Sequence, residues 1–170
     1  NNYDYKVESP PENSKSELSL VIDQYNNPKN IKDLQNDLDN HPEKLFHQIL
    51  KDEGIDESLK SIRDLNEEPI SIIKHYKDKF KRKRPTQYAE DLGISWSGDE
   101  DRMSTTDSPS YPSGHTVQAY YVAHTLSDRY PNLRDKFINL AESISQSRID
   151  RGVHFPSDVD SGRTLARQIF

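Results

Sequence analysis

The chain has 170 residues, a net charge of −6 and a mean hydropathy of −1.01, so it is long enough for one domain and unsuited to general attraction to nucleic acid. Its lack of Cys excludes disulfides, thiolate metal sites and Cys nucleophiles, and its sequence holds no membrane-spanning run of about 18 apolar residues. Leu, Ile, Val and Phe make up 37 of the 170 residues. This fraction lies just above the roughly 20% below which highly charged chains stay unfolded, so we expect a compact domain with a small core.

The N-terminal part predicts an arm followed by short helices. Residues 1–14 are polar and contain Pro10 and Pro11, which indicates a loose N-terminal arm. Residues 15–170 are expected to form a single helical domain, although 18–22 fits a strand or a helix. Spacings of three and four then predict three amphipathic helices. Their apolar stripes are Ile31, Leu34 and Leu38; Leu45, Phe46, Ile49 and Leu50; and Ile55, Leu59, Ile62 and Leu65.

The C-terminal part predicts four longer helices, and the fold class is all-α. They are expected over about 69–83, 114–129, 131–151 and 156–170. Pro85 ends the first of them, because the residue before proline disfavours helix. Residues 86–110 predict a long loop, which in a small domain is usually functional or disordered. Its Tyr88, Trp96 and acidic residues 99–101 are expected to shape the entrance to a site.

A run of basic residues covers 74–84. We interpret it as the solvated end of a helix. The alternative is a non-enzymatic surface that binds nucleic acid or another acidic partner. The net charge of −6 and the absence of interleaved aromatic residues argue against that alternative.

Four polar side chains fall on the inward faces of the C-terminal helices. Lys77, His115, Arg148 and Asp158 each continue an apolar stripe at helical spacing. One such residue would most often be a satisfied core residue, but four together predict a polar cavity at one end of a helix bundle. The cations Lys77 and Arg148, with Arg84 close by, outnumber Asp158, so the cavity is expected to bind an anion.

The start of the helix at 114 strengthens this expectation. Free backbone N–H groups at a helix N-terminus favour an anion, Gly114 allows close approach of the backbone, and Ser113 can cap the helix or donate its hydroxyl. Arg84 and Arg148 suit phosphate oxygens. A tetrahedral oxyanion is therefore the expected occupant.

Two of the six His residues have chemically useful neighbours. Asp158, four residues after His154, can hold one imidazole nitrogen and leave the other free to attack. His115 can act as general acid. A metal on His154 and Asp158 is the rival interpretation, and Lys77, Arg84 and Arg148 would repel it.

The pattern Lys77-x6-Arg84-Pro85, Pro112-Ser113-Gly114-His115 and Ser147-Arg148-x5-His154-x3-Asp158 resembles the three-part signature of the type 2 phosphatidic acid phosphatase (PAP2) superfamily. That superfamily includes bacterial class A non-specific acid phosphatases, lipid phosphate phosphatases and vanadium-dependent haloperoxidases. The stretches SYPSGHT (110–116) and SDVDSGR (157–163) look most like the soluble class A enzymes. The resemblance covers residues 68–170.

This resemblance implies a helical bundle with a phosphate pocket and a metal-independent phosphomonoesterase without a cofactor. The substrates would be small soluble phosphoesters, and phosphate or vanadate would occupy the pocket. By similarity, Lys77, Arg84, Ser113, Gly114 and Arg148 would hold the phosphoryl oxygens. His154 would form a phosphohistidine, Asp158 would orient it, and His115 would act as general acid and base.

A vanadium haloperoxidase with the same pocket is the alternative. The resemblance also favours a periplasmic or secreted location, although no signal peptide is visible, and it leaves a homo-oligomer open.

Overall fold

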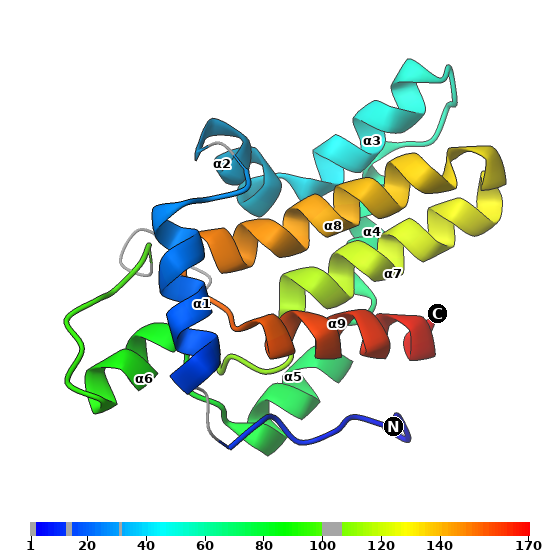
Figure 1. Ribbon diagram of the computed structural model, residues 1–170. Helices are drawn as coiled ribbons and strands as arrows, with labels where there is room; N and C mark the ends of the chain where they lie inside the picture. Colours follow the sequence, from blue (N-terminus) through cyan, green and yellow to red (C-terminus); the bar gives the residue numbers. More distant parts are fainter. Residues whose placement is uncertain (1–2, 13–14, 31, 100–106) are drawn as a thin grey trace.

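The computed structural model describes residues 3–12, 15–30, 32–99 and 107–170, and every regular element in these ranges is helical (Figure 1). This confirms the all-α class. The elements are α1 (Lys15–Asn26), α2 (Lys32–Asn40), α3 (Pro42–Asp52), α4 (Leu59–Glu67), α5 (Ile70–Phe80), α6 (Pro85–Asp91), α7 (Gly114–Arg129), the 3-10 turn η2 (Pro131–Leu133), α8 (Arg134–Asp150) and α9 (Pro156–Ile169).

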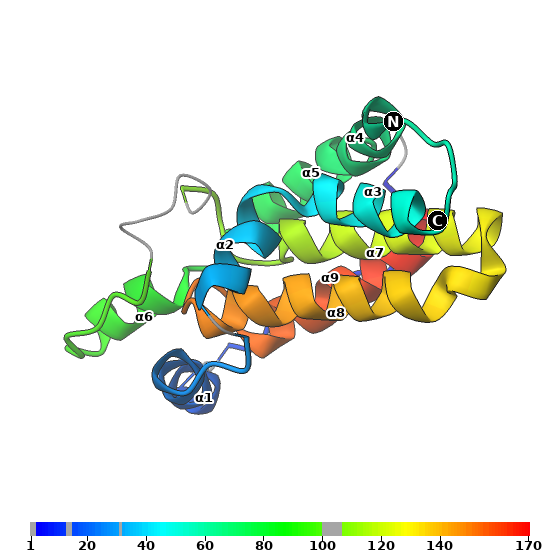
Figure 2. The same ribbon diagram turned by 90° about the horizontal axis from the view of Figure 1, so that it is seen from above.

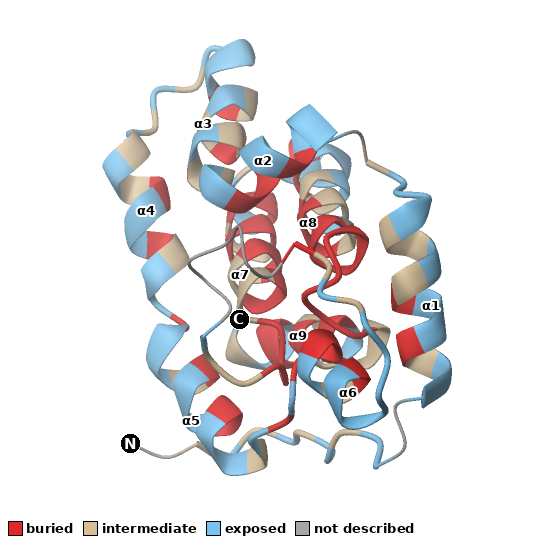
Figure 3. Ribbon diagram, turned by 90° about the vertical axis from the view of Figure 1, so that its left-hand side faces the viewer, coloured by how far each residue is buried: buried red, intermediate tan, exposed pale blue. Residues whose placement is uncertain are grey.

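The centre of the bundle is α7, which packs most extensively against α8 and α9. A tight turn at η2 makes α7 and α8 antiparallel, and α3, α4 and α5 lie along the other side of α7 (Figure 2). The N-terminus of α7, the C-terminus of α8 and the N-terminus of α9 consequently meet at one end of the bundle. Buried residues gather at this end (Figure 3).

Close approach of α9 to α7 depends on Gly162. A Cβ there would lie 2.9 Å from the Thr116 Cβ and 3.0 Å from the Ser113 carbonyl oxygen. Real Cβ atoms do not approach carbon so closely, so this glycine sets the helix spacing. One turn earlier on α9, the Asp158 carbonyl accepts a hydrogen bond of 3.0 Å from the Ser113 amide. The packing thus fixes the start of α7 against the start of α9.

Two apolar clusters hold the helices together. The larger one joins α2–α5 and α7–α9 and includes Phe46, Val117 and Phe137. The smaller one joins α1, α6 and the junction of α8 with α9. Its buried members are Leu18, Val21, Ala89, Ile149, Phe155 and Val159.

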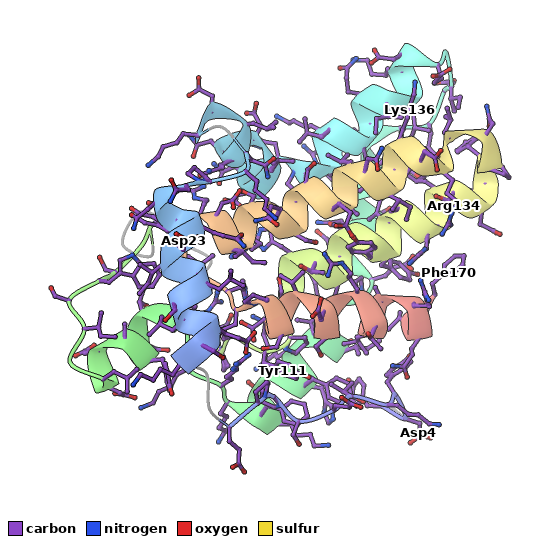
Figure 4. The ribbon with its side chains drawn as sticks, in the orientation of Figure 1. Asp4, Asp23, Tyr111, Arg134, Lys136 and Phe170 are labelled. Atoms are coloured by element: carbon purple, nitrogen blue, oxygen red, sulfur yellow. The ribbon has the colours of Figure 1, made fainter. Side chains whose placement is uncertain are left out.

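The described part of the N-terminal arm, residues 3–12, lies against the bundle. The Tyr76 hydroxyl donates to the Tyr3 carbonyl at 2.8 Å, and the Tyr111 hydroxyl donates to the Glu8 carbonyl at 2.6 Å. Lys6 exchanges two hydrogen bonds with the Gln168 side chain on α9. Tyr111 points toward this segment in Figure 4. Residues 3–12 thus contact α5, α9 and the segment before α7.

Several helix boundaries differ from those predicted. Residues 15–26 are helical, and the expected 86–110 loop contains α6 in its first part because Ala89 packs into the smaller core. The helix predicted to reach residue 83 ends at Phe80, where Lys81 adopts a left-handed conformation with φ 49°. Ile55 precedes the Ser58 cap and lies outside α4.

The stripe predicted on the helix around residue 34 is also rotated. Leu34 is exposed, whereas Gln35, Leu38 and Asp39 are buried; Ile31 lies outside the described residues.

No helix among the described residues is both long enough and apolar enough to span a bilayer.

Candidate active site

A cavity of about 440 Å³ lies at the end of the bundle where α7 begins and α8 ends. Six of the eight predicted site residues line it: Lys77, Arg84, Gly114, His115, Arg148 and His154. The other two, Ser113 and Asp158, are fully buried behind its wall. Ser108 and Pro109 form a further part of the lining, and Ile70 and Ile73 of α5 give it an apolar side.

The basic run 74–84 divides into solvated and buried members. Lys74 is exposed and pairs with Asp78, and Lys81 and Lys83 are exposed. By contrast, Arg84 is 2% exposed, and Lys77 and Arg82 are buried as well. The interpretation of the whole run as a solvated helix end is therefore wrong. Burial alternates over 81–84 because the chain leaves the helix after Lys81 and is extended at Arg84.

Lys77 and Arg84 are both held by the segment just before α7. Lys77 Nζ donates to Ser108 Oγ at 3.1 Å and to the Pro109 carbonyl at 2.8 Å. Arg84 donates to the Ser108 carbonyl at 2.9 Å and to the Val153 carbonyl at 2.9 Å. These acceptors are uncharged oxygens, so they orient the two cations without neutralising them.

Arg148, on the last turn of α8, is fully buried and pairs with Asp39 of α2. Its Nη1 lies 3.2 Å from Asp39 Oδ1, and Asp39 Oδ2 also accepts from Arg151 Nη1 at 2.7 Å. Within the described chain, Arg148 Nε is buried without a hydrogen-bond partner. An unpaired cationic donor at a cavity wall is costly unless a ligand accepts from it.

His154 presents an unprotonated nitrogen to the cavity. Its Nε2 lies 3.0 Å from Arg84 Nη1, and its Nδ1 lies 3.1 Å from Asp158 Oδ2. Because a guanidinium only donates and a carboxylate only accepts, the proton is assigned to Nδ1 and the lone pair to Nε2. Burial, then the charges of Arg84 and Arg148, hold the pKa of His154 well below its usual range, so the ring is neutral at pH 7.

The Asp158 carboxylate accepts from four donors. Besides His154, the Phe155 amide donates to Oδ2 at 2.8 Å, Ser110 Oγ donates to Oδ2, and Arg82 Nη1 donates to Oδ1 at 2.7 Å. Burial raises the pKa of Asp158 to about 6, and Arg82 is the largest influence that opposes this rise. The carboxylate is consequently ionised at neutral pH.

The start of α7 supplies the remaining predicted residues. Ser113 is the N-cap and accepts from the Thr116 amide at 3.3 Å, as the cap interpretation predicted. A Cβ on Gly114 would lie 3.7 Å from Lys77 Cε, so its absence leaves room inside the cavity. His115 Nε2 donates to the Asp39 carbonyl at 3.2 Å. Burial, then Arg148, keeps the pKa of His115 well below its usual range.

The expected entrance residues lie elsewhere. Tyr88 and Trp96 pack against the smaller core, and Asp99 pairs with Arg151 at 3.2 Å. Residues 100 and 101 lie outside the described ranges.

Among the residues that the structure describes, no group of three His, Cys, Asp or Glu side chains could hold a metal ion.

Three contributors to the site were missed by the sequence reasoning: Asp39, Arg82 and Ser108. The alternation Lys-Arg-Lys-Arg over 81–84, directly before Pro85, could have indicated that both Arg side chains point to one side. Asp39 gave no such signal, because its pairing with Arg148 spans 109 residues of sequence.

A match to a protein-family model shows the family of this chain. The family model described as the PAP2 superfamily matches residues 70–169, which is more than half of the chain. The chain belongs to the PAP2 superfamily. The match begins with α5 and contains every residue of the predicted signature.

Relatives within this superfamily include bacterial phosphatases. A non-specific acid phosphatase of Providencia stuartii is 34% identical over 90 residues, which is 53% of this chain and 35% of the relative. One from Salmonella typhimurium is 38% identical over 64 residues, 38% of this chain and 26% of the relative. An acid phosphatase of Zymomonas mobilis is 32% identical over 90 residues, 53% of this chain and 33% of the relative. The chain thus spans about a third or less of the length of these curated relatives.

The titration of Lys77 predicts pH-dependent anion binding by this PAP2 domain. Burial, then Arg84 and Arg148, lowers the pKa of Lys77 to about 7. Above pH 7 the Lys77 ammonium of the free protein loses its proton, so binding of an anion to the protonated form requires uptake of one proton from solvent. Sulfate, a dianion throughout this range, should therefore lose up to about tenfold in affinity per pH unit above 7.

Calorimetric titration with sulfate between pH 6 and 9 measures this effect. Lys77→Arg should flatten the dependence because a guanidinium stays protonated. Lys60→Arg, which replaces an exposed α4 lysine that pairs with Asp64 and lies outside the cavity lining, should keep it. A wild-type sulfate affinity that does not change over this pH range would contradict the prediction.

Proposed function

We propose that this PAP2 domain is a metal-independent phosphomonoesterase that hydrolyses small soluble phosphate esters through a phosphohistidine on His154. The observation that carries the proposal is the His154 ring: Nδ1 is held by Asp158, and the Nε2 lone pair faces a cavity lined by Lys77, Arg84 and Arg148. A neutral nucleophile among fixed cations suits attack on a phosphoryl group.

In the first step, the lone pair of His154 Nε2 forms a bond to phosphorus while the bond from phosphorus to the ester oxygen breaks. The three cations hold the non-bridging oxygens, and Arg84 exchanges its hydrogen bond to Nε2 for one to a phosphoryl oxygen. Positive charge develops on the imidazole, and the Asp158 carboxylate stabilises it. Ser113 and the Gly114 amide complete the cradle in this proposal.

His115 is the proposed general acid, which protonates the leaving group. Its low pKa reflects burial beside Arg148, Lys77 and Arg84, and a phosphate dianion between these cations offsets their charge. The ring then gains a proton and delivers it to the departing alkoxide. In the second step the neutral His115 accepts a proton from water, the oxygen of that water attacks the phosphohistidine, and inorganic phosphate leaves as the N–P bond breaks.

Hydrolysis of p-nitrophenyl phosphate in EDTA is the test of this function. We expect turnover, inhibition by vanadate, and a trapped phosphoryl-enzyme. His154→Ala should abolish both turnover and trapping, whereas His124→Asn on α7, whose ring contacts Tyr120 and Phe170, should keep both.

Two results would overturn this function. One is purified protein that shows no turnover from acid to neutral pH. The other is halide oxidation by peroxide after vanadate loading with negligible phosphatase activity, which would establish the haloperoxidase alternative.

The role of His115 predicts a dependence on the leaving group. In His115→Asn, kcat/KM for an alkyl phosphate should fall by about 10²–10⁴ because alkoxide departure needs the proton. For p-nitrophenyl phosphate the fall should be much smaller, since nitrophenolate leaves unprotonated. Equal losses for the two substrates would rule out the acid role, and His124→Asn is again the matched control.

A further inference from the structure

Asp158 has a strong partner that no part of the proposed chemistry uses. Arg82 Nη1 lies 2.7 Å from Asp158 Oδ1 on the side away from His154, and 2.7 Å from Ser157 Oγ. The guanidinium lies over the Phe155 ring, 4.2 Å from its centroid. Its side chain is only 7% exposed. The Arg82 guanidinium is therefore buried against the first turn of α9.

The other end of Arg82 is held by α1. Arg82 Nη2 lies 3.1 Å from Glu17 Oε2, and the same carboxylate accepts from the Ser157 amide and hydroxyl, both at 2.8 Å. The Ser157 amide belongs to the first turn of α9, where a negative charge is favourable. Glu17 thus fixes both Arg82 and the helix start that carries Asp158, although α1 lies outside the residues matched by the family model.

We propose that Arg82, anchored by Glu17, is a positioning residue that keeps Asp158 ionised and aimed at His154. The four side chains then form one hydrogen-bonded series, in the order Glu17, Arg82, Asp158 and His154. This inference rests on the proposed phosphatase function, since it assigns a role within the same reaction.

The charges around Asp158 explain why Arg82 matters. His154 faces the carboxylate from the junction before α9, Lys77 from α5, Tyr111 from the segment before α7, and Arg82 from the segment after α5. His154 is neutral, Tyr111 is a phenol, and Lys77 is directed to Ser108 and Pro109. Among the described residues, Arg82 is accordingly the cation in direct contact with Asp158.

Loss of this contact would disable the nucleophile by a specific route. Burial already raises the pKa of Asp158 to about 6, and removal of Arg82 raises it further. A protonated Asp158 donates to His154 Nδ1, so the ring proton moves to Nε2. The lone pair then points at Asp158 instead of the phosphorus.

The geometry also explains the choice of Arg over Lys. A guanidinium fork reaches Asp158, Ser157 and Glu17 at once and stacks on Phe155, whereas an ammonium is a compact point charge. Lys at this position should thus restore the charge without the full alignment.

The pH profile of kcat/KM for p-nitrophenyl phosphate tests the proposal. In Arg82→Gln the acid limb of the profile should move to higher pH by about one unit or more. A rise of this size in the pKa of Asp158 is expected when an opposite charge is lost at this distance. Arg82→Lys should give an intermediate limb. Arg163→Gln, which removes a half-buried α9 arginine that pairs with Glu142 and Asp160, should leave the profile unchanged.

The part played by Glu17 has its own readout. If Glu17 anchors Arg82, the shift caused by Arg82→Gln should be smaller in a Glu17→Gln background, because the two residues act through one contact. If Arg82→Gln causes its full shift of the acid limb in that background, Glu17 does not act through Arg82.

An unchanged acid limb in folded Arg82→Gln would overturn the proposal. If Arg82→Gln does not fold, Arg82→Lys becomes the test. An acid limb and a kcat equal to those of the wild type in Arg82→Lys would contradict the positioning role of Arg82. The ¹⁵N shifts of the His154 ring give a readout without turnover: the proton should move from Nδ1 to Nε2 at a higher pH in the variant than in the wild type.

The two readouts separate the proposals. Absence of turnover in the wild type would overturn the phosphatase function and with it the catalytic role of Arg82, while the ¹⁵N titration would still test whether Arg82 sets the protonation of Asp158 and His154. Identical ¹⁵N titrations in wild type and variant sink the assignment while the phosphatase function stands.

Discussion

Positive charge removed from water is the constraint on which this end of the molecule depends. Lys77, Arg84 and Arg148 share one cavity wall, and the first two hydrogen-bond to uncharged oxygens of Ser108 and Pro109. Burial and mutual repulsion push the pKa of Lys77 down to about 7. Cations held in this way are stabilised by a bound anion, so the electrostatics of the free protein favour an anionic ligand.

The carboxylates near the cavity have partners of their own, and Asp78 in its lining pairs with Lys74 at 2.7 Å. Asp158 accepts from Arg82 and His154, while Asp39 accepts from Arg148 and Arg151. Asp39 also holds His115 through its backbone carbonyl, so one residue of α2 contacts two cavity-lining side chains. The helices before residue 70, outside the family match, therefore contribute to the site through Glu17 and Asp39. A fragment restricted to the matched region would leave Arg82, Arg148 and His115 without these partners.

The sequence predicted what local spacing determines. Stripes at helical spacing placed Lys77, Arg148 and Asp158 on inward faces, and the Ser113 cap marked the start of α7 correctly. Contacts between distant segments were not predictable in this way, because the Glu17–Arg82 pair spans 65 residues. The α2 stripe was misread since Leu34 is exposed and Asp39 is buried for its ion pairs. The short α6 is mostly polar, with Tyr88 and Ala89 packing at the smaller core, so composition alone indicated a loop.

In the proposed reaction, the cavity binds a phosphoryl group with His154 Nε2 directly behind the phosphorus. A crystal structure of the protein soaked with vanadate, which mimics the five-coordinate phosphorus of the transition state, tests it most directly. We expect vanadium bonded to His154 Nε2, with the equatorial oxygens within hydrogen-bond distance of Lys77, Arg84 and Arg148. Vanadate bound elsewhere, or bound in the cavity without a bond to His154, would contradict it.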